Sequence, residues 1–269
     1  MRLASAFLVF FLLAQPAAAE TSWVNLKDAT GTTHKALLAL PEGPGKHPGL
    51  IFHHDTNLRK QGYERGREHG FDLKVFATAL AGAGFVTLAP LRRHGRFKPD
   101  AAYVTHRALT DGPPLEFRTA IKEGLESHNS AMGWLGTHAN MDASRISVVG
   151  LGEGALIALW AAGDKRLAAA LLISPTKLRK ARHLSLKLAS DKARIKHLAL
   201  PVFLAMSTKG RRGAAKIARL GLLPALKARR LGKVWARLDY PGANTIFYQP
   251  RGVYWGDVVG FLKQHLGGG

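Results

Sequence analysis

Short apolar runs alternate with longer amphipathic stretches along most of this chain. Two extended segments joined by a Thr30-Gly31 turn predict an N-terminal β-hairpin at the edge of a sheet. Further strands are predicted at 50–54, 85–89, 146–149, 167–173, 202–206 and 245–248, and helices at 73–83, 115–135, 153–162 and 257–265, with a polar loop before residue 73. Buried strands that alternate with helices indicate an α/β fold with a mostly parallel sheet covered on both faces.

The first nineteen residues have the pattern of a secretory signal peptide. Arg2 supplies a positive start, an apolar run follows at 3–14, and small residues lead to Ala19. This run of twelve residues, broken only by Ser5, is too short for a membrane anchor, because a helix rises about 1.5 Å per residue and the hydrocarbon core is about 30 Å thick. We therefore predict a signal peptide at 1–19, cleavage near Ala19, a single domain at 20–269, and a periplasmic or secreted protein.

Composition narrows the class of protein further. The 269 residues are 46% hydrophobic, which excludes a polytopic membrane protein and a disordered tail. The chain has no cysteine, which excludes disulfides, thiolate metal sites and cysteine nucleophiles. Its 39 lysines and arginines against 18 acids give a formal charge of +21, which favours anionic partners.

The segment 146–159 predicts a strand, a glycine-spaced turn and a helix. Gly150, Gly152 and Gly154 have the spacing of a nucleophile elbow, Gly-x-Ser-x-Gly, with glycine in place of the serine. A dinucleotide-binding fingerprint is the competing interpretation, but it requires a third glycine where this chain has Ala155. It also requires an acid at the end of the next strand, which here ends in Ile173-Ser174-Pro175. We therefore expect no cofactor.

With the elbow, three other stretches give the chain a family resemblance. It resembles the α/β-hydrolase superfamily, in its dienelactone-hydrolase-like group, from about Pro48 to the C-terminus. The resemblance implies a single-domain α/β-hydrolase fold. The stretches are Pro48-Gly49-Leu50-Ile51-Phe52-His53-His54, Gly84-Phe85-Val86-Thr87-Leu88-Ala89-Pro90, Asp142-Ala143-Ser144-Arg145-Ile146 before the elbow, and Tyr240-Pro241-Gly242-Ala243.

The resemblance also locates the three positions of a catalytic triad. Gly152 takes the position of the nucleophile, Gly210 that of the acid, and Thr245 that of the histidine. The only downstream histidine, His265, falls inside the closing helix. Because glycine and threonine provide neither nucleophile nor base, we predict a protein that has lost serine-hydrolase activity and acts as a binding or interaction protein.

An active hydrolase with a nonstandard catalytic set is the alternative. Glu153, directly after the empty position, would act as general base with His54 as its partner. His53, His54 and Asp55 also suggest metal ligands, but adjacent strand residues point to opposite faces, so no metal is predicted. Ser174 and Ser207 also end strands, and we interpret them as turn residues. A small-molecule ligand in the remnant of the catalytic pocket would meet His54, Asp55, Arg92, Arg93 and Glu153.

Most of the excess positive charge lies late in the chain. Between Lys177 and Arg237 there are 18 lysines and arginines against one acid, Asp191. Such a surface suits anionic lipid, lipopolysaccharide or another polyanion, whereas a merely solvated face is the competing interpretation. Nucleic acid is not an expected partner of an exported protein. The predicted anion-binding face consists of Lys209, Arg212, Lys216 and Arg219, which recur at helical spacing.

Overall fold

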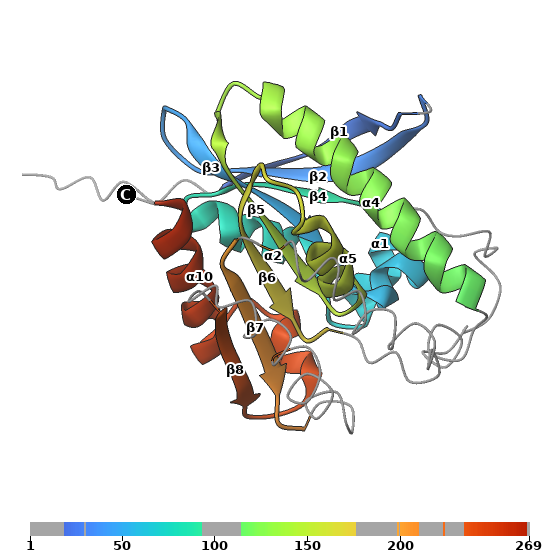
Figure 1. Ribbon diagram of the computed structural model, residues 1–269, viewed down its shortest axis with the longest axis vertical. Helices are drawn as coiled ribbons and strands as arrows, with labels where there is room; N and C mark the ends of the chain where they lie inside the picture. Colours follow the sequence, from blue (N-terminus) through green and yellow to red (C-terminus); the bar gives the residue numbers. More distant parts are fainter. Residues whose placement is uncertain are drawn as a thin grey trace, which may run out of the picture.

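In the part of the chain that the computed structural model describes, one eight-stranded sheet forms the centre of the fold (Figure 1). The described residues are 19–29, 31–92, 114–175, 198, 200–209, 223 and 234–267. The predicted signal peptide lies outside them except for Ala19. The strands are β1 (Glu20–Lys27), β2 (Thr33–Leu40), β3 (His47–His53), β4 (Val86–Pro90), β5 (Met141–Leu151), β6 (Leu167–Ile173), β7 (Val202–Ser207) and β8 (Val234–Tyr240).

The sheet is mostly parallel, and its strand order is β1-β2-β4-β3-β5-β6-β7-β8. β1 pairs antiparallel with β2, with Trp23 opposite Leu37, and β2 pairs antiparallel with β4. All the other neighbours are parallel. The predicted α/β class, the mostly parallel sheet and the N-terminal hairpin are therefore confirmed.

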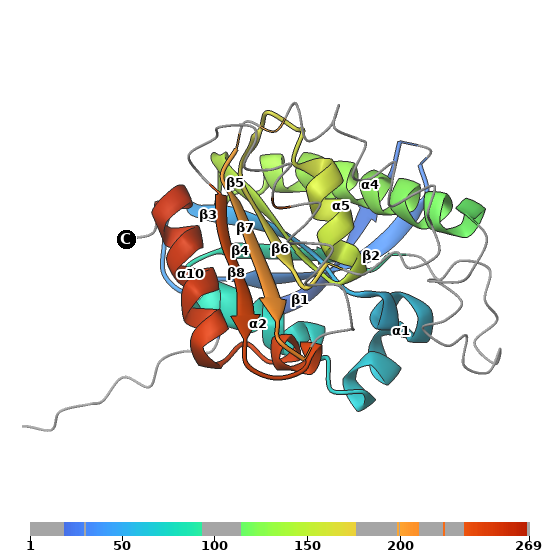
Figure 2. The ribbon, with the colours of Figure 1, turned by 60° about the horizontal axis from the view of Figure 1, so that its bottom comes forward.

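Helices cover both faces of the sheet (Figure 2). On one face lie α4 (Pro114–Thr137) and α5 (Glu153–Ala161), and on the other lie α2 (Leu73–Gly82) and α10 (Gly252–Leu266). α1 (Thr56–Glu68) follows β3. Because both faces are covered, strands such as β4 and β7 are buried along their whole length, which explains their continuous apolar sequence. None of the described helices is both long and apolar enough to cross a bilayer.

Two predictions about the elements are wrong. The segment predicted as the last strand is a 3₁₀ helix, η2 (Asn244–Tyr248), and the last strand is β8. β8 carries Arg237 and Asp239 on exposed positions at the sheet edge, so it lacks the apolar run of a buried strand. The expected polar loop before residue 73 contains α1, whose polar composition concealed it and whose helical geometry breaks at Gly62.

Candidate functional site at the carboxyl edge of the sheet

The carboxyl ends of the parallel strands bring the candidate residues to one edge of the sheet. His54 follows β3, Arg92 lies just after β4, and Gly152 follows β5. In open parallel sheets this edge is where ligands bind. This edge therefore holds the candidate functional residues.

Gly152 forms the apex of a sharp turn between β5 and α5. Its φ of 62° and ψ of −114° are angles that favour glycine, and its N–H donates to the carbonyl of Ile173 at 2.9 Å. Side chains are excluded on both sides of the apex. A Cβ on Gly150 would lie 2.1 Å from the carbonyl oxygen of Gly154, and one on Gly154 would lie 1.9 Å from that of His53. The strand, tight turn and helix of a nucleophile elbow are present, without a side chain at the apex.

Glu153, the first residue of α5, is buried in a network of hydrogen bonds. Arg59 donates from Nε to Oε1 at 2.7 Å and from Nη2 to Oε2 at 3.2 Å. Arg92 donates from Nη1 to Oε1, and the hydroxyl of Thr56 donates to Oε2 at 3.1 Å. Burial alone would raise the pKa of Glu153, but the positive charges of Arg92 and Arg59 outweigh it and hold that pKa at about 2. Glu153 is thus a permanently ionised partner of two buried arginines.

Arg92 connects Glu153 to the loop that follows β3. Its Nη2 donates to the carbonyl oxygens of His54 and Asp55, the latter at 3.1 Å. Its backbone N–H donates to Nε2 of His54 at 3.2 Å, and Nδ1 of His54 lies 2.9 Å from the carbonyl oxygen of Asp55. Nη2 of Arg92 also lies 3.2 Å from Nδ1 of His54, but because Nε2 accepts the backbone N–H of Arg92, the proton of a neutral His54 is assigned to Nδ1. Burial lowers the pKa of His54 well below 6.5.

Asp55 caps α1. Its Oδ1 accepts the backbone N–H of Leu58 at 3.1 Å, and its Oδ2 accepts the hydroxyl of Tyr248 at 3.2 Å. Burial raises the pKa of Asp55 above its usual range. Both carboxylate oxygens therefore have partners within the protein, which gives Asp55 a structural role at the start of α1.

His53 points to the opposite face from His54, as expected for neighbours on a strand. Its Nε2 lies 3.2 Å from Nδ1 of His128 on α4, and both rings are buried. Burial lowers the pKa of His53 well below 6.5 and that of His128 to about 4. Nδ1 of His53 and Nε2 of His128 have no hydrogen-bond partner among the residues that the structure describes. Among the described residues, no three potential ligands converge on a metal site.

Other residues singled out from the sequence are more dispersed. Thr245 is exposed in η2, and Ser207, which ends β7, donates to Oδ1 of Asn244 at 2.6 Å. His265 packs against Trp235 near the start of β8, at the opposite edge of the sheet from Gly152. Lys209 is exposed just after β7. Several predicted site residues lie outside the residues that the structure describes: Arg93, Gly210, Arg212, Lys216 and Arg219. The same holds for the rest of the basic segment up to Lys233, except for Leu198, 200–209 and Leu223.

Sequence reasoning missed Arg59 and Thr56, which donate to Glu153, and also His128, which contacts His53 on the other face. Arg59 lies in a polar stretch whose composition indicates exposure, and its burial depends on a carboxylate 94 residues away. His128 belongs to an amphipathic helix and gave no signal of its own. The only local signal was Asp55, a typical capping residue four positions before Arg59.

Comparisons with known proteins agree on the fold. Neither a scan against protein-family models nor a search of curated proteins finds a match for this chain. Among solved structures, a protein from Klebsiella pneumoniae described as a dienelactone hydrolase has a TM-score of 0.65 and 17% identity, over 92% of this chain and 100% of its own. An esterase from Pyrococcus furiosus gives 0.63 and 17%, over 93% and 94%. An acylaminoacyl peptidase from Pyrococcus horikoshii gives 0.67 and 17%, over 93% of this chain and 42% of its own.

Proposed function

From the dienelactone-hydrolase-like α/β-hydrolase fold that this chain has, we propose that it is a protein without serine-hydrolase activity that binds anionic surfaces. The observation that supports the lack of serine-hydrolase activity is the glycine, Gly152, at the apex of the elbow. The elbow keeps the backbone angles and the close glycine packing that present a nucleophile, yet its apex has no side chain. Covalent catalysis at this position has no attacking atom.

The surroundings of the elbow support the same conclusion. In this fold the oxyanion hole is formed by the backbone N–H after the nucleophile and by an N–H from the loop after β3. Here the residue after the apex is Glu153, whose carboxylate is buried. Arg92 donates hydrogen bonds both to this carboxylate and to the carbonyl oxygens of the loop after β3. The guanidinium groups of Arg59 and Arg92 donate to this carboxylate and to the loop carbonyls, so these donors serve the fold rather than a developing oxyanion.

The alternative of Glu153 as general base with His54 has less support. A base needs a pKa near the working pH and a free lone pair, whereas the pKa of Glu153 is about 2 and both its oxygens accept hydrogen bonds. The Nε2 lone pair of His54 is used by the backbone N–H of Arg92. The cluster is better suited to hold α1, α5 and the loop after β4 together.

The second half of the proposal rests on charge. The segment from Lys177 to Arg237 contains 18 lysines and arginines against one acid, which suits anionic lipid, lipopolysaccharide or another polyanion. Export with cleavage near Ala19 would place this charge outside the cytoplasm, where such surfaces occur. A small molecule held near Arg92 and the elbow is a further part of this proposal.

An esterase assay tests the first half. Purified mature protein should hydrolyse short nitrophenyl esters no faster than buffer does, at any pH between 6 and 9. Saturable turnover that survives repeated purification would contradict the proposal. The Glu153→Gln variant would then separate the alternatives, because loss of turnover without loss of folding would point to Glu153 as the base.

A further inference from the structure

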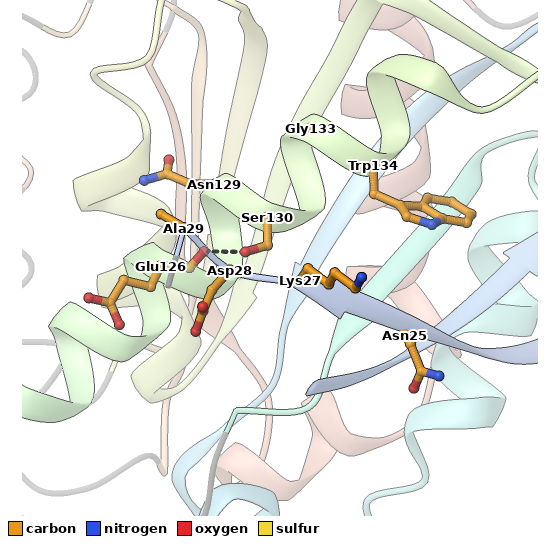
Figure 3. Close-up of a pocket in the computed structure, with 9 residues that line it drawn as sticks. All are labelled: Asn25, Lys27, Asp28, Ala29, Glu126, Asn129, Ser130, Gly133 and Trp134. Carbon is orange, nitrogen blue, oxygen red and sulfur yellow. Dashed lines mark hydrogen bonds between the residues drawn. The ribbon is translucent and has the colours of Figure 1, made fainter. Parts of the chain in front are cut away.

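A hollow lies between α4 and the end of β1 with the turn after it, away from the elbow. It has a volume of about 590 Å³, within the range of small-molecule sites. The hollow is lined by β1, whereas the elbow follows β5. These two strands are separated by three others, which places them about 19 Å apart at the usual strand spacing. Figure 3 shows its lining residues, which are Asn25, Lys27, Asp28, Ala29, Glu126, Asn129, Ser130, Gly133 and Trp134.

One wall of the hollow is a single face of α4. Its five lining residues recur at spacings of three and four and run from Glu126 to Trp134. Eight residues of helix correspond to about 12 Å, which is long enough for a disaccharide. The other wall is the end of β1 and the turn after it. In Figure 3, Trp134 lies at one end of the α4 row and Glu126 at the other.

Gly133 keeps the hollow open. Gly133 is exposed, and a Cβ built on it would meet no atom of the described residues within 4 Å, so the space beside the helix is open there. The neighbouring Trp134 is half-buried, and its ring stacks on that of His138 with centroids 4.8 Å apart. The aromatic ring is therefore held in place before any ligand arrives.

The polar groups of the hollow are suited to hydroxyls. The side-chain amides of Asn25 and Asn129 are exposed in the hollow, and each offers both donors and an acceptor. Asp28 and Glu126 add carboxylates, of which Oδ1 of Asp28 already accepts the backbone N–H of Thr32 at 2.9 Å and Oε1 of Glu126 lies 3.7 Å from Nζ of Lys122. Lys27 is the only cation among the described lining residues, and Lys122 pairs with Glu126 beside them, so the local charges balance although the chain carries +21. An anionic ligand gains little from such a lining.

We propose that this hollow binds a neutral saccharide. A pyranose ring has one apolar face, which fits against an aromatic ring, and a rim of hydroxyls that donate and accept hydrogen bonds. Trp134 supplies the first surface, and Asn25, Asn129 and Glu126 supply partners for the second. The site is independent of the elbow and of the basic segment, because it shares no residue with either.

The test uses a variant that fills the hollow. Gly133→Leu introduces a side chain into open space and removes a glycine from a helix interior, so α4 should keep or gain stability. Gly136→Leu is the matched control, since Gly136 is also exposed on α4 with open space but does not line the hollow. Binding of cellobiose, maltose and chitobiose to the mature protein is measured by saturation-transfer NMR and calorimetry. Retention on insoluble cellulose, starch and chitin distinguishes a polymer from a free sugar.

The parent and Gly136→Leu should bind at least one of these sugars with the same affinity, and Gly133→Leu should lose at least tenfold. Asn129→Ala should weaken binding about fivefold, the value of one neutral hydrogen bond. If the parent binds none of the three sugars or polymers, the proposal is wrong. It is equally wrong if Gly133→Leu binds as the parent does.

Discussion

Arg59 donates two hydrogen bonds to Glu153, from Nε to Oε1 at 2.7 Å and from Nη2 to Oε2 at 3.2 Å. This paired geometry joins α1 to the first residue of α5, directly beside the empty apex of the elbow. Both side chains are buried, 4% and 3% exposed, so neither charge has access to water as a substitute partner. The cluster is therefore a structural centre located where the fold usually places chemistry.

Replacing Glu153 should destabilise the protein strongly. Glu153→Gln leaves the charges of Arg59 and Arg92 buried without a carboxylate, and removing one partner of a buried ion pair costs about 3–5 kcal/mol. Denaturant unfolding of the variant and the parent measures the difference. Glu64→Gln, which breaks an exposed pair with Arg67, is the control and should change stability by about 0.5 kcal/mol or less. Equal stability of the two variants would show that the buried cluster does not hold the fold together.

Stability should fall as the pH decreases from 7 to 5. The pKa of His128 is lowered from 6.5 to about 4. Between these pH values His128 is protonated in the unfolded chain but stays neutral in the folded protein. For this residue alone, the loss amounts to about 3 kcal/mol once the pH has fallen to 4. His53 and His54, whose pKa values are also lowered, act in the same direction.

Two buried carboxylates titrate in different pH ranges or directions from these histidines, so their effects on stability can be distinguished. Glu153, with a pKa of about 2, contributes stability above pH 4.5 that is lost only as the pH falls toward 2. Asp55 has a raised pKa and acts in the opposite direction, since its protonation in acid favours the folded state. The His128→Gln variant should therefore show a shallower loss of unfolding free energy between pH 7 and 5 than the parent. An unchanged slope in His128→Gln, or the same flattening in the exposed control His69→Gln, would contradict the assignment.

The close packing at the elbow should tolerate no side chain at Gly154. Gly154→Ala would place a Cβ 1.9 Å from the carbonyl oxygen of His53, which requires α5 and β3 to separate. We expect a loss of about 3 kcal/mol or more in unfolding free energy, at the upper end for overpacked sites. Gly163→Ala, where a Cβ meets no atom within 4 Å, should be nearly neutral. Similar effects of the two variants would mean that the elbow is looser than its backbone geometry indicates.

The sequence predicted the elements that are buried on both sides far better than those at the edges. Strands such as β6 and the elbow before α5 have continuous apolar runs or glycine spacing, and both were found. β8 and α1 were missed because their exposed, charged residues mask the pattern. The buried cluster could not be predicted, because Arg59 and Glu153 are distant in sequence and only the folded chain shows that they pair.

Binding to anionic membranes should depend on salt and on the basic segment. The quadruple reversal of Lys209, Arg212, Lys216 and Arg219 to Glu should abolish co-sedimentation with vesicles that contain anionic lipid. Each lysine or arginine near such a surface contributes about 1 kcal/mol, and screening shortens the interaction from about 30 Å at 0.01 M salt to about 8 Å at physiological ionic strength. Vesicles of neutral lipid serve as the control. Equal sedimentation of parent and reversed variant, or no effect of salt, would contradict membrane binding and show that the basic segment is only a solvated surface.

The most direct measurement of the central claim is labelling by a fluorophosphonate serine probe, read by intact mass and peptide mapping. The parent should remain unlabelled, because Gly152 offers no hydroxyl at the apex of the elbow. Gly152→Ser should also stay unlabelled, since Thr245 provides no base for the new hydroxyl, and only its combination with Gly210→Asp and Thr245→His should react. Stoichiometric labelling of the parent at any serine, including Ser174 beside the elbow, would show that the protein is an active serine hydrolase and contradict the account.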